Sequence, residues 1–348
     1  MIATKGYAVH SHTDSLAPWD FERREIGPND VFIQILFSGI CHSDIHQVRG
    51  EWGNSHYPMV PGHEIVGRIT EIGPGVTKFA VGDLAGIGCM VDSCRTCNNC
   101  QSGHEQFCEK GQTVYTYNSF EKDGVTPTYG GYSNHIVCAE EFVVRVSDKL
   151  AIEGVAPLLC AGITTYSPLK RWGIGQGHKV AVLGLGGLGH MAVKFAAAFG
   201  ADVTMLSTSP SKEVDAKRLG AHHFCNTKDR AQVKELMNSF DFIIDTVSAS
   251  HDYDMYLGML RTNGVMICVG IPAEPIHFKG FALLGQNRTI TGSSIGGIAE
   301  TQEMLDYCAE NNIVSDVEVI GISYVNEAYE RVMSSDVKYR FVIDMATL

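Results

Sequence analysis

The sequence predicts an α/β protein with two domains, one rich in β-strands and one built on a doubly wound parallel sheet. A chain of 348 residues is too long for one compact hydrophobic core. In residues 1–156, short alternating runs such as 31–36 and 65–69 are interrupted by Gly, Pro and Asp, which is typical of a small, partly open barrel. From residue 157 onwards, short apolar strands alternate with helices, which indicates βαβ units.

The parallel-sheet domain is predicted to cover residues 157–293. Its expected strands are 180–183, 203–206, 242–244 and 265–269. Residues 294–348 carry a predicted helix at about 300–311 and a last strand at 340–343. We expect this tail to return to the β-rich domain, which then consists of residues 1–156 and 294–348.

The composition excludes several classes of partner. A formal net charge of −12 at pH 7 argues against nucleic-acid binding, which depends on neutralising phosphates. No run approaches the roughly 18 apolar residues of a membrane span, so we expect no membrane partner. The N-terminal residues lack the pattern of a secretory leader, and we expect a cytoplasmic location. In a reducing compartment, clusters among the eleven cysteines indicate metal binding or catalysis rather than disulfides.

A glycine-rich turn connects the first strand of the parallel sheet to a helix. Residues 184–189 read Gly184-Leu185-Gly186-Gly187-Leu188-Gly189 and satisfy the G-x-G-x-x-G pattern. Such glycines allow a tight turn and let the backbone and the helix N-terminus approach a pyrophosphate. Because the motif has its strand–turn–helix context, it predicts a dinucleotide site.

The end of the second strand distinguishes NADP(H) from NAD(H). An NAD site usually places an acidic residue about 20 residues beyond the glycines, where it binds the ribose hydroxyls. Here Ser207, Thr208, Ser209 and Lys212 occupy that region without a carboxylate, which favours a ribose that carries a 2′-phosphate. The alternative, a group of helix-capping residues, is compatible with the same role. We therefore predict NADP(H).

Four closely spaced cysteines form the most specific metal-binding motif in the sequence. Cys94, Cys97, Cys100 and Cys108 lie within fifteen residues, and four thiolates suit a closed tetrahedral zinc site. Disulfides are the rival interpretation. We interpret the site as structural. The remaining cysteines outside the candidate ligand sets are interpreted as ordinary thiols: Cys89, Cys138, Cys225, Cys268 and Cys308.

A second metal site would need ligands from distant parts of the chain. The candidates are Cys41, His63, Glu64 and Cys160. Two thiolates and an imidazole suit a catalytic Zn²⁺, but spacing alone does not identify this set, and each residue taken singly could be a core residue.

Taken together, these motifs resemble the zinc-containing medium-chain alcohol dehydrogenases. The resemblance rests on residues 39–44 (GICHSD), 61–64 (PGHE), the four-cysteine segment, Cys160 and residues 184–189, and it runs over essentially the whole chain in matching order. Residues 158–169 (LLCAGITTYSPL) and the Ser-Thr-Ser segment with Lys212 are most similar to the cinnamyl-alcohol-dehydrogenase branch. The resemblance implies a GroES-like catalytic domain and a Rossmann domain.

The resemblance also implies roles for residues near the catalytic zinc. Cys41, His63 and Cys160 would be its ligands, with water or substrate in the fourth place and Glu64 as a possible alternate ligand. Ser43 would pass the substrate proton onward, and His46 would relay it to solvent. Asp44 would orient His63. For His46 the alternative is a surface histidine on a helix.

Further resemblances concern the cofactor and the substrate. His42 and Arg340 match pyrophosphate contacts, although a surface ion pair is the alternative for Arg340. Thr164 and Leu188 match residues beside the nicotinamide ring. The expected carboxamide contacts are backbone groups near Val269, Ser293 and Ile295. The expected apolar pocket residues, which could equally be core packing, are Trp52, Met90 and Ile295.

The predicted activity is hydride transfer between NADP(H) and a primary alcohol or aldehyde, with aromatic (cinnamyl-type) or medium-chain substrates and a broad specificity. Two Zn²⁺ per chain and a homodimer are implied by the resemblance. One alternative is a zinc polyol or secondary-alcohol dehydrogenase, which usually uses NAD(H). The other is a non-catalytic cofactor-binding protein related to zinc-free quinone reductases, which lack the cysteine ligands present here.

Overall fold

The computed structural model describes residues 1–272 and 274–348, and the chain folds as two compact units. The first unit contains Met1–Ile163 and Gly296–Leu348, and the second contains Thr164–Ile295. Within the described residues, no helix is long and apolar enough to cross a membrane.

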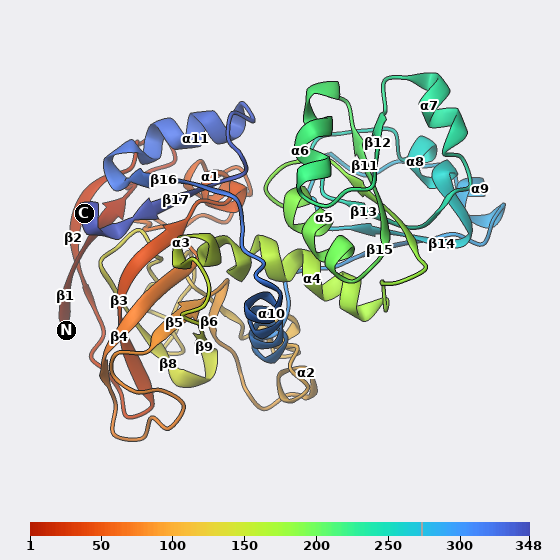
Figure 1. Cartoon of the computed structure of the whole chain (residues 1–348). Helices are drawn as coiled ribbons and strands as arrows, with labels where there is room; N and C mark the ends of the chain where they lie inside the picture. Colours follow the sequence, from red (N-terminus) through yellow and green to blue (C-terminus); the bar gives the residue numbers. More distant parts are fainter. Residues whose placement is uncertain (273) are drawn as a thin grey trace. The chain divides into compact units, whose positions relative to one another are not determined.

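The first unit is built on a mixed seven-stranded sheet (Figure 1). Its order is β16 (Val317–Gly321), β17 (Arg340–Asp344), β3 (Asp30–Gly39), β4 (Ile65–Ile72), β5 (Leu84–Ile87) and β9 (Val144–Arg145), with β8 (His135–Ala139) paired to β3. Two strand pairs accompany it: β1 (Ile2–Ala8) with β2 (Ala17–Arg23), and β6 (Met90–Asp92) with β7 (Val114–Tyr115). The C-terminal strand β17 pairs antiparallel with β3, so the last segment of the chain belongs to the same sheet as strands from its first hundred residues.

The first unit also contains α-helices. They are α1 (His42–Val48), α2 (Asn98–Gln101), α3 (Ile152–Val155), α10 (Ile298–Asn311) and α11 (Val325–Met333). Helix α1 begins directly after β3, and helix α11 buries Val325, Ala328, Tyr329 and Val332, the spacing of one apolar helix face.

The second unit is a six-stranded parallel sheet. Its order is β12 (His223–Asn226), β11 (Asp202–Ser207), β10 (Lys179–Leu183), β13 (Phe240–Asp245), β14 (Leu260–Cys268) and β15 (Thr289–Gly292). Its helices are α4 (Ala161–Arg171, which starts in the first unit), α5 (Gly189–Ala198), α6 (Glu213–Arg218), α7 (Arg230–Glu235), α8 (Tyr253–Met259) and α9 (Phe281–Leu284). The predicted α/β class, a β-rich part and a doubly wound parallel sheet, is confirmed.

Two strands of this sheet were not predicted from the sequence. Strand β12 is four residues long and contains an exposed His223, and β15 is equally short with no fully buried residue. Both strands lie at the edges of the sheet, where fewer neighbouring elements bury the side chains. Their sequences therefore contain no apolar run. Central β13, by contrast, is buried at every position.

The glycine turn between β10 and α5 has the geometry that its sequence predicts. Gly184 has φ +89°, a conformation that favours glycine, and its N–H donates to the Leu206 carbonyl oxygen at 3.0 Å. A Cβ atom on Gly189 would lie 1.8 Å from the Gly184 carbonyl oxygen, whereas one on Gly186 would meet nothing within 4 Å. The first and third glycines therefore serve the turn and its packing, and the second leaves open space beside the backbone.

Gly189→Ala should destabilise the second unit, because the added methyl group overlaps a backbone oxygen that cannot rotate away. We expect the Tm to fall by about 5 to 10 °C in a thermal melt followed by circular dichroism. Gly186→Ala is the matched control and should shift the Tm by no more than about 1 °C. Equal Tm values for the two variants would contradict this account of the turn.

Candidate active site

The side chain that organises the candidate site is Asp44, which is fully buried at the start of α1. Its carboxylate accepts the backbone N–H of Cys41 at 2.8 Å and that of Gly62 at 3.2 Å. It also accepts a hydrogen bond from Nδ1 of His63 at 3.0 Å, which leaves Nε2 of that ring free to bind another group. One carboxylate thus connects the end of β3 to the loop before β4.

Four candidate ligands converge beside this carboxylate. One ligand atom from each of Cys41, His63, Glu64 and Cys160 lies within 4.8 Å of all the others. Cys41 follows β3, His63 and Glu64 precede β4, and Cys160 directly follows the short helix η3 (Ala156–Leu159). The sulfur atoms of Cys41 and Cys160 are 3.9 Å apart. Two thiols, an imidazole and a carboxylate in a mostly buried cluster fit Zn²⁺ in ligand type and spacing.

The protonation of the cluster follows from its contacts. The hydrogen bond from Cys160, with the positive charge of Arg340, lowers the pKa of Cys41 despite burial. The same bond raises the pKa of Cys160. Burial opposes protonation of His63, but Asp44 together with the thiols of Cys89 and Cys41 outweighs it, and the pKa of that ring is raised. The two sulfur atoms lie within hydrogen-bonding distance of each other, and a dication that displaces the proton between them would gain two thiolate ligands.

Glu64 is fully buried and forms an ion pair with Arg340, the first residue of β17. Burial raises the pKa of Glu64 to about 7, although the guanidinium opposes the shift. Arg340 is only 5% exposed, so the surface ion pair considered for it is wrong. Its role as a pyrophosphate contact stays a prediction.

The expected relay residues lie on the same short helix. Ser43 is half-buried in the first turn of α1, and His46 lies in the last turn with its Nδ1 paired to the Glu51 carboxylate. The His46 ring stacks on Trp52 with a centroid distance of 5.2 Å. Trp52 is 41% exposed, whereas Met90, the other expected pocket residue of this unit, is 2% exposed.

Several residues near the cluster were not singled out in the sequence. Cys89 was interpreted as an ordinary thiol, but it forms a hydrogen bond with Cys160 that lowers the pKa of Cys89. The Tyr117 ring stacks on His63 at 5.8 Å, and the Tyr132 hydroxyl reaches Asp44 at 3.5 Å. None of these residues belongs to a local motif, so only the folded chain reveals their proximity.

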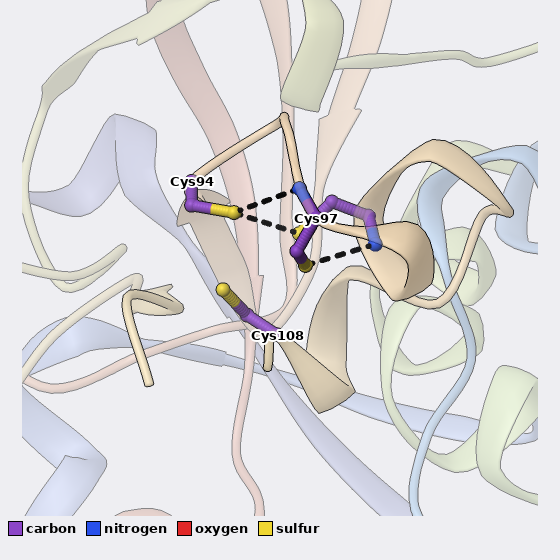
Figure 2. Close-up of side chains that lie close together, drawn as sticks. Cys94, Cys97 and Cys108 are labelled. Atoms are coloured by element: carbon purple, nitrogen blue, oxygen red, sulfur yellow. Dashed lines mark hydrogen bonds between the residues drawn. The ribbon is translucent and has the colours of Figure 1, made fainter. Parts of the chain in front are cut away.

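The four-cysteine segment forms a separate cluster (Figure 2). The sulfur atoms of Cys94, Cys97, Cys100 and Cys108 lie within 4.8 Å of one another. The Thr96 N–H lowers the pKa of Cys94 to about 6, with a further contribution from the Cys97 N–H against partial desolvation. All eleven cysteines lie in the described part of the chain and are free, so disulfides do not explain this cluster.

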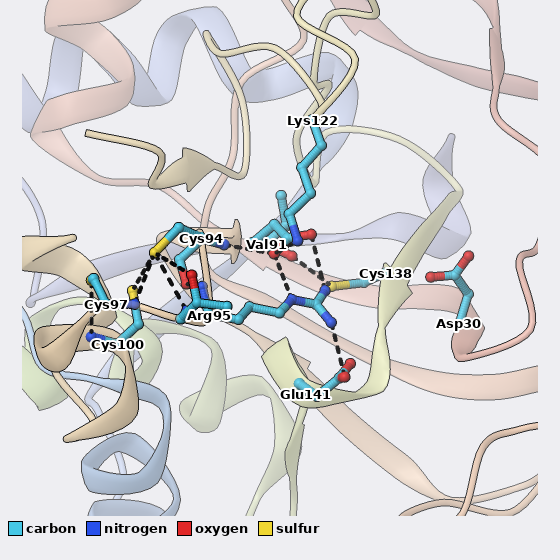
Figure 3. A network of polar contacts seen from close by, with 12 residues as sticks. Asp30, Val91, Cys94, Arg95, Cys97, Cys100, Lys122, Cys138 and Glu141 are labelled. Carbon is cyan, nitrogen blue, oxygen red and sulfur yellow. Dashed lines mark hydrogen bonds and ion pairs between the residues drawn. The ribbon is translucent and has the colours of Figure 1, made fainter. Parts of the chain in front are cut away.

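Arg95 connects the cysteine segment to the rest of the first unit (Figure 3). It occupies a left-handed conformation with φ +61° inside the turn that carries Cys94 and Cys97. Its guanidinium donates to Asp92 at 2.8 and 2.9 Å and to Glu141 at 2.8 Å. The segment is therefore fixed by an ion-pair network as well as by its own thiols.

The residues expected to bind the 2′-phosphate lie at the carboxyl end of β11. Ser207 is buried, Thr208 is exposed, and Ser209 and Lys212 are half-buried. The Lys212 ammonium donates to the Leu185 carbonyl oxygen in the glycine turn at 2.8 Å. The end of β11 and the glycine turn are thus joined by a direct contact.

Backbone groups of the residues expected around the nicotinamide already form hydrogen bonds within the protein. The N–H groups of Val269 and Ser293 donate to backbone carbonyls of Asp245 and Cys268 at 2.9 and 3.2 Å, so neither N–H is free for a ligand. Ile295 has φ +41°, a strained conformation for a β-branched residue and one that concentrates at functional sites.

The other expected cofactor residues are distributed over both units. Thr164 is buried in α4. Leu188 is half-buried at the start of α5, and His42 of the first unit is exposed at the start of α1.

A glycine turn for a dinucleotide, a closed four-thiol cluster and a second cluster of mixed ligands define a metal-dependent dehydrogenase. Residues 27–148 match the family profile described as an alcohol dehydrogenase GroES-like domain, and residues 187–310 match that of a zinc-binding dehydrogenase. The chain belongs to the zinc-dependent alcohol dehydrogenase family.

Similar proteins support the same family over the full length. An NADP-dependent alcohol dehydrogenase C of Mycolicibacterium smegmatis is 54% identical, with 100% of this chain and 99% of the relative covered. A probable mannitol dehydrogenase of Fragaria ananassa is 51% identical, with 98% and 94% covered. The structure of a cinnamyl alcohol dehydrogenase from Sorghum bicolor has a TM-score of 0.95 and 46% identity, with 99% and 98% covered. That of the Helicobacter pylori enzyme, complexed with NADP(H), has a TM-score of 0.93 and 44% identity, with 99% of both chains covered.

Asp44→Asn should weaken zinc binding at the mixed cluster by about 10- to 100-fold, because His63 loses the carboxylate that orients and polarises it. Competition with a chromogenic chelator measures this affinity, and the four-cysteine site of the same protein serves as an internal reference. Asp241→Asn is the matched control, since Asp241 is a buried carboxylate of the second unit that accepts the Lys179 N–H at 2.8 Å. Equal zinc affinity in the Asp44 variant and the control would refute the orienting role.

Proposed function

We propose that the chain transfers a hydride between NADP(H) and a primary alcohol or aldehyde, with aromatic, cinnamyl-type compounds as the favoured class. The observation that carries the proposal is the convergence of Cys41, His63 and Cys160 within 4.8 Å, in a family of zinc-dependent alcohol dehydrogenases. A zinc ion bound there would supply Lewis-acid chemistry, which stabilises an alkoxide and polarises a carbonyl.

The chain's own residues would bind the ion and move the proton. Cys41 and Cys160 would bind as thiolates and His63 through Nε2, with its orientation fixed by Asp44. The Ser43 hydroxyl would take the proton of the bound alcohol and at the same time release its own proton towards the cofactor ribose and His46. His46, paired with Glu51 and partly exposed, would pass it to solvent.

NADP(H) is supported by the groups at the end of β11. No carboxylate follows Ser207 before Lys212, and a 2′-phosphate there would meet hydroxyls and an ammonium group. The relatives add support, since one is an NADP-dependent enzyme and another was solved with NADP(H).

A homodimer is part of the proposal. Strand β15 is the last strand of the parallel sheet and offers its outer backbone groups for pairing. On α9, Phe281 and Leu284 are 79% and 81% exposed, which favours a second copy of the chain as their cover. The cytoplasmic location stays a prediction.

The substrate class can be tested with a panel of aldehydes and alcohols. We expect a kcat/KM at least about tenfold higher with NADPH than with NADH for cinnamaldehyde, because the 2′-phosphate adds charged contacts. We expect a similar margin of about tenfold for oxidation of cinnamyl alcohol over mannitol, and about two zinc ions per chain by atomic emission. Faster turnover of mannitol would favour a polyol dehydrogenase, and a protein with zinc but no turnover would favour a non-catalytic role.

His46→Ala should lower kcat for alcohol oxidation by about tenfold, most strongly at low pH, where solvent offers little base to accept the proton directly. The pH–rate profile between about pH 6 and 10 checks this expectation. His223→Ala is the control, because His223 is an exposed imidazole paired with Asp202 at 3.0 Å in the second unit. A pH profile that His46→Ala leaves unchanged would remove the relay from the mechanism.

A further inference from the structure

The ion pair between Glu64 and Arg340 lies beside the candidate zinc ligands, and the expected roles of the two residues do not explain why they pair with each other. Glu64 precedes β4, and Arg340 begins β17, 276 residues later in the chain. The exposed fractions of their side chains are 0% and 6%. A buried ion pair of this kind contributes little net free energy to folding, because desolvation offsets the attraction. The loss of one partner destabilises the fold strongly, because it leaves a buried charge without a counter-ion.

Only one carboxylate oxygen of Glu64 is occupied. Oε1 accepts the bond from Nη2 of Arg340, whereas Oε2 has no hydrogen-bond partner among the described residues. The carboxylate lies over Gly39, where a Cβ atom would approach Oε2 to 2.0 Å. The absence of a side chain at Gly39 thus allows Glu64 to occupy this position. An unpartnered, fully buried carboxylate oxygen is a potential metal ligand.

Two positive charges would therefore compete for one carboxylate. A carboxylate oxygen of Glu64 lies within 4.8 Å of ligand atoms of Cys41, His63 and Cys160, so it could reach an ion bound among them. Two thiolates would neutralise a dication formally, whereas the Arg340 guanidinium is a permanent positive charge whose largest favourable partner is Glu64. The guanidinium is thus the stronger partner while it is present.

We infer that Arg340 is a positioning residue that holds Glu64 away from the metal and keeps the fourth coordination place available for exchangeable ligands. The inference rests on the proposed zinc site. Without the guanidinium, the Glu64 carboxylate would bind the ion as a fourth protein ligand and close the site. Arg340 would thus set how readily water, alcohol or aldehyde enters.

Cobalt(II) substitution tests the inference without reliance on turnover. Imidazole binding to the cobalt protein is followed by the change in the visible d–d spectrum, and the four-cysteine site contributes no difference signal because it has no open place. Arg340→Met should bind imidazole at least about tenfold more weakly than the wild type and release cobalt to a chelator more slowly. Arg340→Met combined with Glu64→Gln should restore imidazole binding, because an uncharged amide does not replace the exchangeable ligand.

Control variants distinguish a general loss of stability from a specific effect on imidazole binding. Arg23→Met removes another buried guanidinium of the first unit, which donates to the Gly130 carbonyl and Ser133 hydroxyl, and it should lower the Tm while imidazole affinity stays unchanged. If Arg340→Met does not fold, imidazole binding is measured with Arg340→Lys instead. Its affinity for imidazole should be about threefold lower than that of the wild type, because lysine lacks the two-pronged guanidinium group. Wild-type imidazole affinity in the Arg340 variants, or no rescue in the double variant, would overturn the inference. A wild-type protein that takes up cobalt only at the four-cysteine site would overturn the proposed function instead.

Discussion

The bonds to Asp44 hold together the parts of the chain on which the candidate active site depends. This carboxylate is completely buried, yet it accepts the backbone N–H groups of Cys41 and Gly62 and the imidazole N–H of His63. Each bond compensates part of the cost of burying the charge. Because the donors come from two separate segments, the same bonds bring two candidate ligands together before any ion is present.

Charge balance explains the surroundings of the cluster. Two cysteine sulfur atoms and the carboxyl groups of Glu64 and Asp44 lie close together, with Arg340 as a nearby cation. Such a set is repulsive in a low-dielectric interior unless protons or a metal ion compensate it. In the absence of a metal ion, the hydrogen bond between Cys41 and Cys160 meets part of that requirement. The four-cysteine cluster is organised differently, since backbone N–H groups approach the sulfur atoms of Cys94 and Cys97.

The sequence predicted the features that are local along the chain. The glycine turn at 184–189 and the cysteines between 94 and 108 are recognisable because their spacing carries the geometry. Cys160 became a candidate ligand only through the family resemblance, since 119 residues separate it from Cys41. Tertiary packing brings Cys89 and Tyr117 close to the cluster and pairs Glu64 with Arg340. No sequence motif indicates these contacts. Strands β12 and β15 were not predicted, because they are short edge strands without an apolar run.

Two thiolates and one imidazole from distant segments are proposed to bind a single zinc ion. A crystal structure with anomalous data collected at the zinc absorption edge would show whether they do. We expect two ions per chain, one of them about 2.3 Å from the sulfur atoms of Cys41 and Cys160 and about 2.0 to 2.1 Å from Nε2 of His63. Anomalous density at the four-cysteine cluster alone, in protein purified with excess zinc, would show that Cys41, His63 and Cys160 do not form a zinc site.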